Sequence, residues 1–126
     1  MSETSKGPMM ALVVEDDQNQ ADLVGALLEE ADFQVVEVAS GEEALACLHD
    51  HAHDIALLYA DLRLGRSIDG IDLARAVSIN WPWIRLIVTS GDPEEDFDQL
   101  PETARFMRKP WRALDLLVEA ERISPS

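Results

Sequence analysis

The feature that most constrains the fold of this chain is the regular alternation of short apolar runs with segments that suit helices. The runs are rich in β-branched residues and fit β-strands at residues 10–14, 33–39, 54–60, 84–89 and 104–108. Helix-compatible segments follow them at 18–31, 41–49, 71–80, 92–100 and 111–123, of which 92–100 is short and acidic. Strict alternation predicts right-handed crossovers and a parallel sheet with helices on both faces. Because five strands cannot close an eight-stranded barrel, the expected fold is α/β, a doubly wound five-stranded sheet.

Composition limits the number of domains and the kinds of ligand. A chain of 126 residues with 47% hydrophobic content suits one domain, which we expect at 9–123 between a flexible N-terminal tail at 1–8 and a short C-terminal tail at 124–126. A net charge of −15 argues against direct binding to nucleic acid, whose phosphates would be repelled. Neither a signal peptide nor a membrane-spanning run is visible, and one cysteine allows no disulfide framework. A cytoplasmic location is expected.

Local patterns predict the start of one helix and the buried face of another. Asp17 immediately precedes the first helical segment, so we expect it to be an N-cap rather than a metal ligand. In the last segment, Leu114, Leu117 and Val118 have helical spacing and are expected to form one buried face.

Histidine and tryptophan also recur, and neither pattern is assigned a ligand. The histidines alternate in an expected solvated turn before the third strand and are His49, His51 and His53. Without a nearby cysteine, that arrangement does not indicate a metal site. The tryptophans are expected to cover the edge of the core, and they are Trp81, Trp83 and Trp111.

Polar side chains follow four of the predicted strands at the point where each strand ends. These residues are Glu15, Asp16, Asp61, Thr89 and Lys109. In a doubly wound sheet, such ends meet at the edge where ligands bind. Three carboxylates at one edge repel one another unless a cation neutralises them, and an all-oxygen set suits Mg²⁺. With a lysine and a hydroxyl beside them, they can position a phosphoryl group for transfer to a carboxylate.

These residues and their flanking motifs resemble the receiver domains of two-component response regulators over about residues 9–123. The motifs are LVVEDD at 12–17, the aspartate closing the third strand, DG at 69–70, VTSG at 88–91 and RKPW at 108–111. The resemblance implies a flavodoxin-like sheet with strand order 2-1-3-4-5. It also implies a signalling switch phosphorylated by a sensor histidine kinase or a histidine phosphotransfer protein, not an enzyme that turns over a separate substrate.

The resemblance implies a role for each site residue. Asp61 would be the phosphoacceptor. The ligands of Mg²⁺, or of Mn²⁺ in its place, would be Glu15, Asp16, Asp61 and the backbone carbonyl of Arg63. Thr89 and Lys109 would bind the phosphoryl group, and Thr89 with Phe106 would form the conformational switch. The peptide bond from Lys109 to Pro110 would be cis.

Partners and competing functions stay open. The resemblance implies an unidentified downstream target and allows a phosphorylation-dependent homodimer, whether the chain acts alone or belongs to a larger regulator or hybrid kinase. One alternative is a metal-dependent phosphatase with an aspartyl-phosphate intermediate, which would need a second carboxylate where this chain has Arg63. Another is an interaction module that is never phosphorylated. A flavin binder of the same architecture would need a glycine-rich phosphate loop where this chain has Glu15, Asp16 and Asp17.

Overall fold

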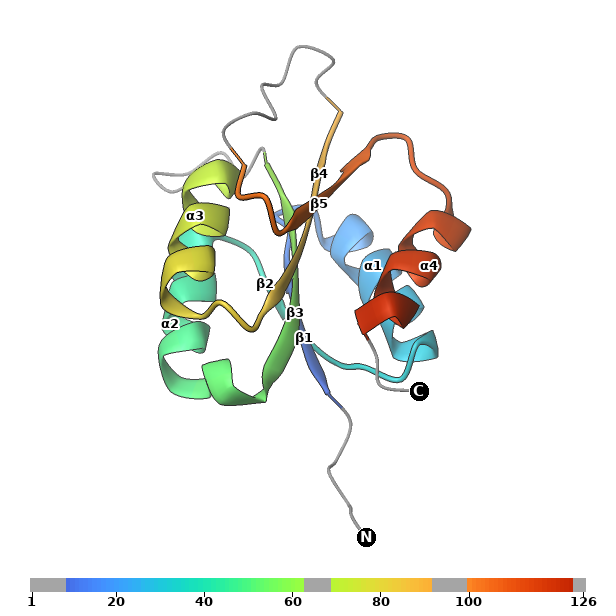
Figure 1. The fold of residues 1–126 in the computed structure, drawn as a ribbon. Coiled ribbons are helices and arrows are strands. Elements are labelled where there is room, and N and C mark those ends of the chain that lie inside the picture. The colour runs from blue at the N-terminus through green and yellow to red at the C-terminus, as the bar shows by residue number, and fades with distance from the viewer. Residues whose placement is uncertain (1–8, 63–68, 92–99, 124–126) are drawn as a thin grey trace, which may run out of the picture.

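The computed structural model describes residues 9–62, 69–91 and 100–123, and these form one parallel sheet flanked by helices (Figure 1). The strands are β1 (Met10–Val14), β2 (Gln34–Val38), β3 (Ile55–Asp61), β4 (Arg85–Ser90) and β5 (Ala104–Arg108). The helices are α1 (Gln18–Glu30), α2 (Gly41–His51), the 3-10 helix η1 (Ala52–Asp54), α3 (Gly70–Asn80) and α4 (Ala113–Ile123). The order β2-β1-β3-β4-β5 confirms the predicted doubly wound fold. The predicted tails lie outside the described residues, as does nearly all of the predicted helix at 92–100.

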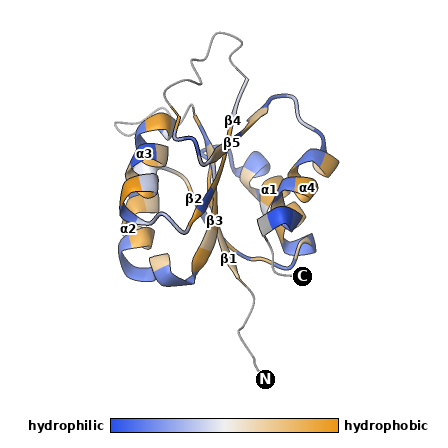
Figure 2. Ribbon diagram, viewed as in Figure 1, coloured by the Kyte–Doolittle hydropathy of each residue, from blue (hydrophilic) through white to orange (hydrophobic). Residues whose placement is uncertain are grey.

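Helices cover both faces of the sheet, α2 and α3 on one and α1 and α4 on the other (Figure 1). Hydrophobic and hydrophilic residues alternate along each of these helices (Figure 2). Successive strand residues point to opposite faces, so Leu58 joins the core under α2 and α3 while Tyr59 joins the core under α1 and α4. Covered on both faces, the central strands β1 and β3 are apolar over most of their length.

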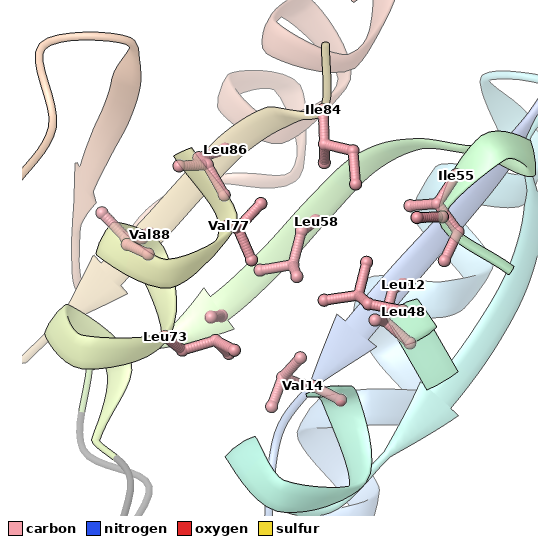
Figure 3. Close-up of a cluster of buried hydrophobic side chains, with 14 of the residues drawn as sticks. Leu12, Val14, Leu48, Ile55, Leu58, Leu73, Val77, Ile84, Leu86 and Val88 are labelled. Atoms are coloured by element: carbon pink, nitrogen blue, oxygen red, sulfur yellow. The ribbon is translucent and has the colours of Figure 1, made fainter. Parts of the chain in front are cut away.

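The core under α2 and α3 shows how these layers are held together (Figure 3). Leu12, Leu58 and Leu86 come from three adjacent strands and meet Leu48 of α2 and Val77 of α3. All five side chains are at most 1% exposed. Such burial removes apolar surface from water on every element at once, which fixes the helices against the sheet.

Side-chain caps begin the helices that leave the carboxyl edge of the sheet. Asp17 accepts a hydrogen bond from the backbone N–H of Gln20 at 3.1 Å, which confirms its prediction as the N-cap of α1. Asp69 accepts from the N–H of Asp72 at 2.9 Å and caps α3 in the same way. Each carboxylate satisfies a backbone donor that the helix itself leaves unpaired.

The predicted apolar face of α4 is wrong in two of its three residues, because only Leu117 packs against the core. Leu114 is 62% exposed and Val118 is 41% exposed, whereas Leu116 and Ala120 are fully buried against the sheet and α1. Residues 116, 117 and 120 also satisfy helical spacing, so this helix carries two apolar stripes that the sequence cannot rank. Docking against the sheet selects one of them.

Two tryptophans cover the core as predicted, and the third does not. Trp81 and Trp111 pack against the two core clusters. Trp83 is 47% exposed, stacks on His53 at 5.8 Å between ring centroids, and donates from Nε1 to the carbonyl of Ala52 at 3.1 Å. The histidines lie in α2 and η1 rather than in a turn. In the described part of the chain, no helix has the length and apolarity needed to cross a bilayer.

Candidate functional site

The strand register gathers the predicted site residues at the carboxyl edge of the sheet. Asp61 is the last residue of β3 and lies opposite Thr89 on the neighbouring strand β4. Glu15 directly follows β1, which pairs with β3 on its other side. Lys109 directly follows β5, the neighbour of β4. Four strand ends therefore contribute to one edge, where doubly wound sheets bind ligands.

Lys109 and Asp61 are in direct contact. The ammonium Nζ lies 2.5 Å from Oδ2 of the carboxylate, whose side chain is only 8% exposed. The backbone N–H of Lys109 donates to the carbonyl of Ser90 at 2.9 Å, which continues the sheet ladder past the end of β5. The following peptide bond, to Pro110, is cis as predicted. A backbone hydrogen bond and an ion pair therefore both fix the position of this lysine.

Glu15 is a buried carboxyl with one unsatisfied oxygen. Its side chain is 5% exposed, and Oε2 accepts a hydrogen bond from the N–H of Asp17 at 3.2 Å, while Oε1 has no hydrogen-bond partner among the described residues. Burial raises the pKa of Glu15 to about 7 and the charge of Asp61 adds to the rise, although the Asp17 N–H and Lys109 oppose it. Asp16, in contrast, is exposed to solvent.

Thr89 and Tyr59 place two further hydroxyl groups on the same face of the sheet as Asp61. Both side chains are fully buried, and neither hydroxyl has a hydrogen-bond partner among the described residues. Burial raises the pKa of Tyr59, and the charges of Glu15 and Asp61 raise it further. Our sequence prediction missed Tyr59. The sequence feature that could have indicated it is a tyrosine in an otherwise aliphatic run, two residues before the candidate phosphoacceptor.

Phe106 lies on the other face of the sheet from Thr89. Its register partner on β4 is Val88, and it packs against the core under α2 and α3. The guanidinium of Arg108 lies 5.5 Å from the centre of its ring. The predicted switch pair therefore starts from opposite faces of the sheet. The predicted metal ligand Arg63 lies outside the described residues.

Gly70 lets the start of α3 approach the end of β3. A Cβ atom at this position would lie 2.5 Å from Cα of Leu62 and 2.8 Å from the carbonyl oxygen of Asp61. Only glycine fits so close to another backbone segment. This close approach explains why the DG motif has glycine at position 70, next to the site.

The carboxylates fit Mg²⁺ in donor chemistry, because all their ligand atoms are oxygen. The buried, unpartnered Oε1 of Glu15 is a donor that a cation would satisfy. Within 9–62, 69–91 and 100–123, however, no three His, Cys, Asp or Glu side chains are grouped closely enough to hold a metal ion.

Comparison with known proteins identifies the family that has this arrangement. The family model for the response regulator receiver domain matches residues 11–120. The chain belongs to this family. A heme response regulator HssR from Staphylococcus saprophyticus is 25% identical to this receiver domain over 114 residues, 89% of this chain and 50% of that protein. The HssR of Staphylococcus haemolyticus is 28% identical with the same coverage. The chain spans about half the length of these curated relatives.

Solved structures agree with the fold. The receiver domain of NtrX from Brucella abortus has a TM-score of 0.79 and 28% identity, covering 90% of this chain and 96% of that one. A response regulator receiver protein from Sinorhizobium medicae has a TM-score of 0.84 over 92% of this chain and 94% of that one. At 21% identity, the second similarity concerns the fold alone.

Proposed function

We propose that this receiver domain accepts a phosphoryl group on Asp61 from a phosphohistidine of a sensor histidine kinase or histidine phosphotransfer protein. The observation that supports it most directly is the contact between Lys109 and Asp61 at the carboxyl edge of the sheet. In the transfer, an oxygen of Asp61 attacks phosphorus and the P–N bond breaks. Its electron pair stays on the ring nitrogen, and the histidine leaves as neutral imidazole when its other ring nitrogen carries a proton.

Lys109 and Thr89 are the groups we assign to the phosphoryl oxygens. Phosphoryl transfer requires mainly positioning and neutralisation of charge. The ammonium of Lys109 already lies beside the Asp61 carboxylate. Thr89 is the register partner of Asp61, and its buried hydroxyl has no hydrogen-bond partner within the described ranges. Each can bind one oxygen of the transferred group.

A divalent cation completes the proposed site. Mg²⁺, or Mn²⁺ in its place, supplies positive charge beside the phosphoryl oxygens when it is bound. Its proposed ligands are Glu15, Asp16, Asp61 and the backbone carbonyl of Arg63. The oxygen donors and the unpartnered Oε1 of Glu15 support this set. The exposure of Asp16 suits Mg²⁺, which usually keeps several water ligands.

Phosphorylation is proposed to act by shifting the population between two conformations. Thr89 moves toward the phosphoryl group and Phe106 turns inward, which changes the affinity of the surface near β5 and α4 for a downstream target or for a second copy of the chain. The functional unit is proposed to be 9–123, a cytoplasmic signalling phosphoacceptor that does not turn over a separate substrate. Nucleic acid and membranes are not among its proposed partners.

Labelling with a small phosphodonor tests the phosphoacceptor. With radiolabelled acetyl phosphate and Mg²⁺, we expect the wild-type chain to take up label and Asp61→Asn to take up none. Asp17→Asn is the matched control, because asparagine is an equally good N-cap and the variant keeps α1 intact. Persistent label in Asp61→Asn would refute the assignment.

Two further measurements separate the alternatives. Mg²⁺ should quench tryptophan emission of the wild-type chain, and Asp16→Asn should need a much higher Mg²⁺ concentration for the same change. An Asp16→Asn titration identical to that of the wild type would remove Asp16 from the ligand set. Multiple turnovers of a small phosphoester that stop in Asp61→Asn would establish the phosphatase instead.

A further inference from the structure

A polar pocket lies at the carboxyl edge of the sheet, between the ends of β1 and β2 and the starts of α1 and α2. Its volume is about 200 Å³, and its polar lining consists of Gln18 and three glutamates, Glu15, Glu37 and Glu43. Pockets for whole small-molecule ligands are usually larger. This one therefore suits the head group of a single side chain.

The three glutamates of the pocket have only neutral hydrogen-bond donors. Each carboxylate accepts one hydrogen bond, at 2.9 to 3.2 Å. Within residues 9–62, 69–91 and 100–123, none of them forms an ion pair with a lysine or arginine. The donors are the backbone N–H of Asp17 to Glu15, the side-chain amide of Gln18 to Glu37, and the backbone N–H of Ala39 to Glu43. Carboxylates gathered without a positive partner attract a cation.

Two of these glutamates are set in the pocket by their surroundings. The amide Nε2 of Gln18 donates to Oε1 of Glu37, and a Cβ atom at Gly25 would lie 2.8 Å from Oε2, so the glycine leaves room for this carboxylate against α1. Glu15 is 5% exposed, and no described residue donates to its Oε1. A buried carboxylate oxygen without a donor is destabilising, so a cation that brings N–H groups into the pocket gains hydrogen bonds as well as charge.

The arrangement of the carboxylates favours a guanidinium group. They come from the end of β1, from β2 and from the first turn of α2. In the part of the chain that the structure describes, they are not grouped closely enough to hold a metal ion. A guanidinium has five N–H donors in a planar fork and binds acceptors that lie apart, whereas the three donors of a lysine ammonium share one atom.

We propose that this pocket receives an arginine side chain of the protein that delivers the phosphoryl group to Asp61. The inference rests on the proposed function, because that protein must bring its phosphohistidine to this edge of the sheet. Glu15 and Asp61 belong to the neighbouring strand ends of β1 and β3, so a protein that reaches Asp61 also covers the pocket. The net charge of −15 favours a basic partner surface, and complementary charge contributes to both the rate of association and specificity.

NMR titration with a short peptide tests the pocket without phosphorylation. The probe is acetyl-Gly-Arg-Gly-amide, added to the nitrogen-15-labelled chain, and we expect a saturable shift of the side-chain amide signals of Gln18. The same peptide with lysine in place of arginine should bind more weakly. Glu37→Gln removes a charge but keeps an acceptor for Gln18, so it should weaken binding of the arginine peptide about threefold, as expected for an exposed ion pair.

Glu30→Gln is the matched control, because it removes the same charge from an exposed position at the other end of α1. It should leave peptide binding unchanged. Absence of a saturable shift, equal affinity for the lysine peptide, or equal weakening by both substitutions would overturn the arginine pocket.

The source of the arginine is tested by comparing two phosphodonors. One is acetyl phosphate, and the other is a phosphorylated histidine kinase that labels the wild-type chain. The labelling rate with the kinase, divided by the rate with acetyl phosphate, should fall about threefold in Glu37→Gln and stay unchanged in Glu30→Gln. An unchanged ratio in Glu37→Gln would overturn the assignment of the arginine to the phosphodonor protein.

These measurements also separate the pocket from the phosphoacceptor. A chain that is labelled on Asp61 but shows no Gln18 shift with the arginine peptide would overturn the pocket and leave the proposed function standing. A chain that binds the peptide but takes no label from either donor would overturn the proposed function and, with it, the partner assigned to the pocket.

Discussion

The ammonium of Lys109 lies 2.5 Å from the carboxylate of Asp61, although 48 positions separate the two residues in the chain. The sheet creates this contact, because β3 and β5 flank β4 and end at the same edge. We expect Lys109→Gln to lower the rate of Asp61 labelling by about 10²-fold, the usual effect of removing one group that stabilises developing charge. The rate at which acetyl phosphate labels Asp61 in the variant and in the wild type measures this effect.

The matched control for this variant is Arg112→Gln. Arg112 is a nearby cation whose side chain is 83% exposed, so its loss should leave the labelling rate unchanged. Equal rates for Lys109→Gln and the wild type would mean that the ion pair has no part in phosphorylation.

Gly70 should not tolerate even one added methyl group. In Gly70→Ala the Cβ atom would meet the backbone of residues 61 and 62 at 2.5 to 2.8 Å, so the end of β3 must shift. We expect the free energy of unfolding to fall by about 1–3 kcal/mol and Asp61 labelling to slow. Gly25→Ala is the control, because its Cβ atom would meet an exposed side-chain oxygen of Glu37 instead of backbone. Urea unfolding should show little loss in the control, and equal losses would contradict the steric argument.

Leu114 and Leu116 of α4 should differ sharply in their effect on stability. Leu116 is fully buried, so Leu116→Ala should lower the free energy of unfolding by about 2–5 kcal/mol. Leu114 is 62% exposed, and Leu114→Ala should change it by less than about 0.5 kcal/mol. Urea unfolding of both variants decides between the observed face of α4 and the face expected from sequence. A larger loss in Leu114→Ala would reverse the assignment.

Glu15 should make stability depend on pH when Mg²⁺ is removed by a chelator. Its pKa rises from an ordinary 4.5 to about 7 in the folded chain, so between these values the folded state holds a proton that the unfolded state has released. The contribution is fully present below about pH 4.5 and is lost as the pH rises through about 7. The free energy of unfolding should therefore decrease over this range.

Glu15→Gln isolates this effect from other titrating groups. Glutamine cannot release a proton, so the decrease across that range should be smaller in the variant than in the wild type. Urea unfolding at several pH values, with the chelator present throughout, gives both curves. Curves of equal slope would show that Glu15 does not carry a raised pKa.

Much of the secondary structure and of the site's position could be predicted because their signals are local. The boundaries of the described strands and helices lie within about two residues of those expected, since hydrophobic periodicity and turn residues act over short stretches. The N-cap at Asp17 was predictable because its partner is the N–H three residues away. The carboxyl-edge rule was enough to expect Glu15, Asp61 and Lys109 at one edge of the sheet.

What the sequence determined by itself was therefore the order of the elements, the parallel sheet and the edge at which its polar residues meet. Only the tertiary structure decided which stripe of α4 is buried and that Phe106 and Thr89 occupy opposite faces of the sheet. It also decided that the buried hydroxyl of Tyr59 has no hydrogen-bond partner in the part of the chain that the structure describes. These outcomes depend on strand register and on how helices dock against the sheet. Such contacts join residues far apart in the chain, so no local pattern of residues can encode them.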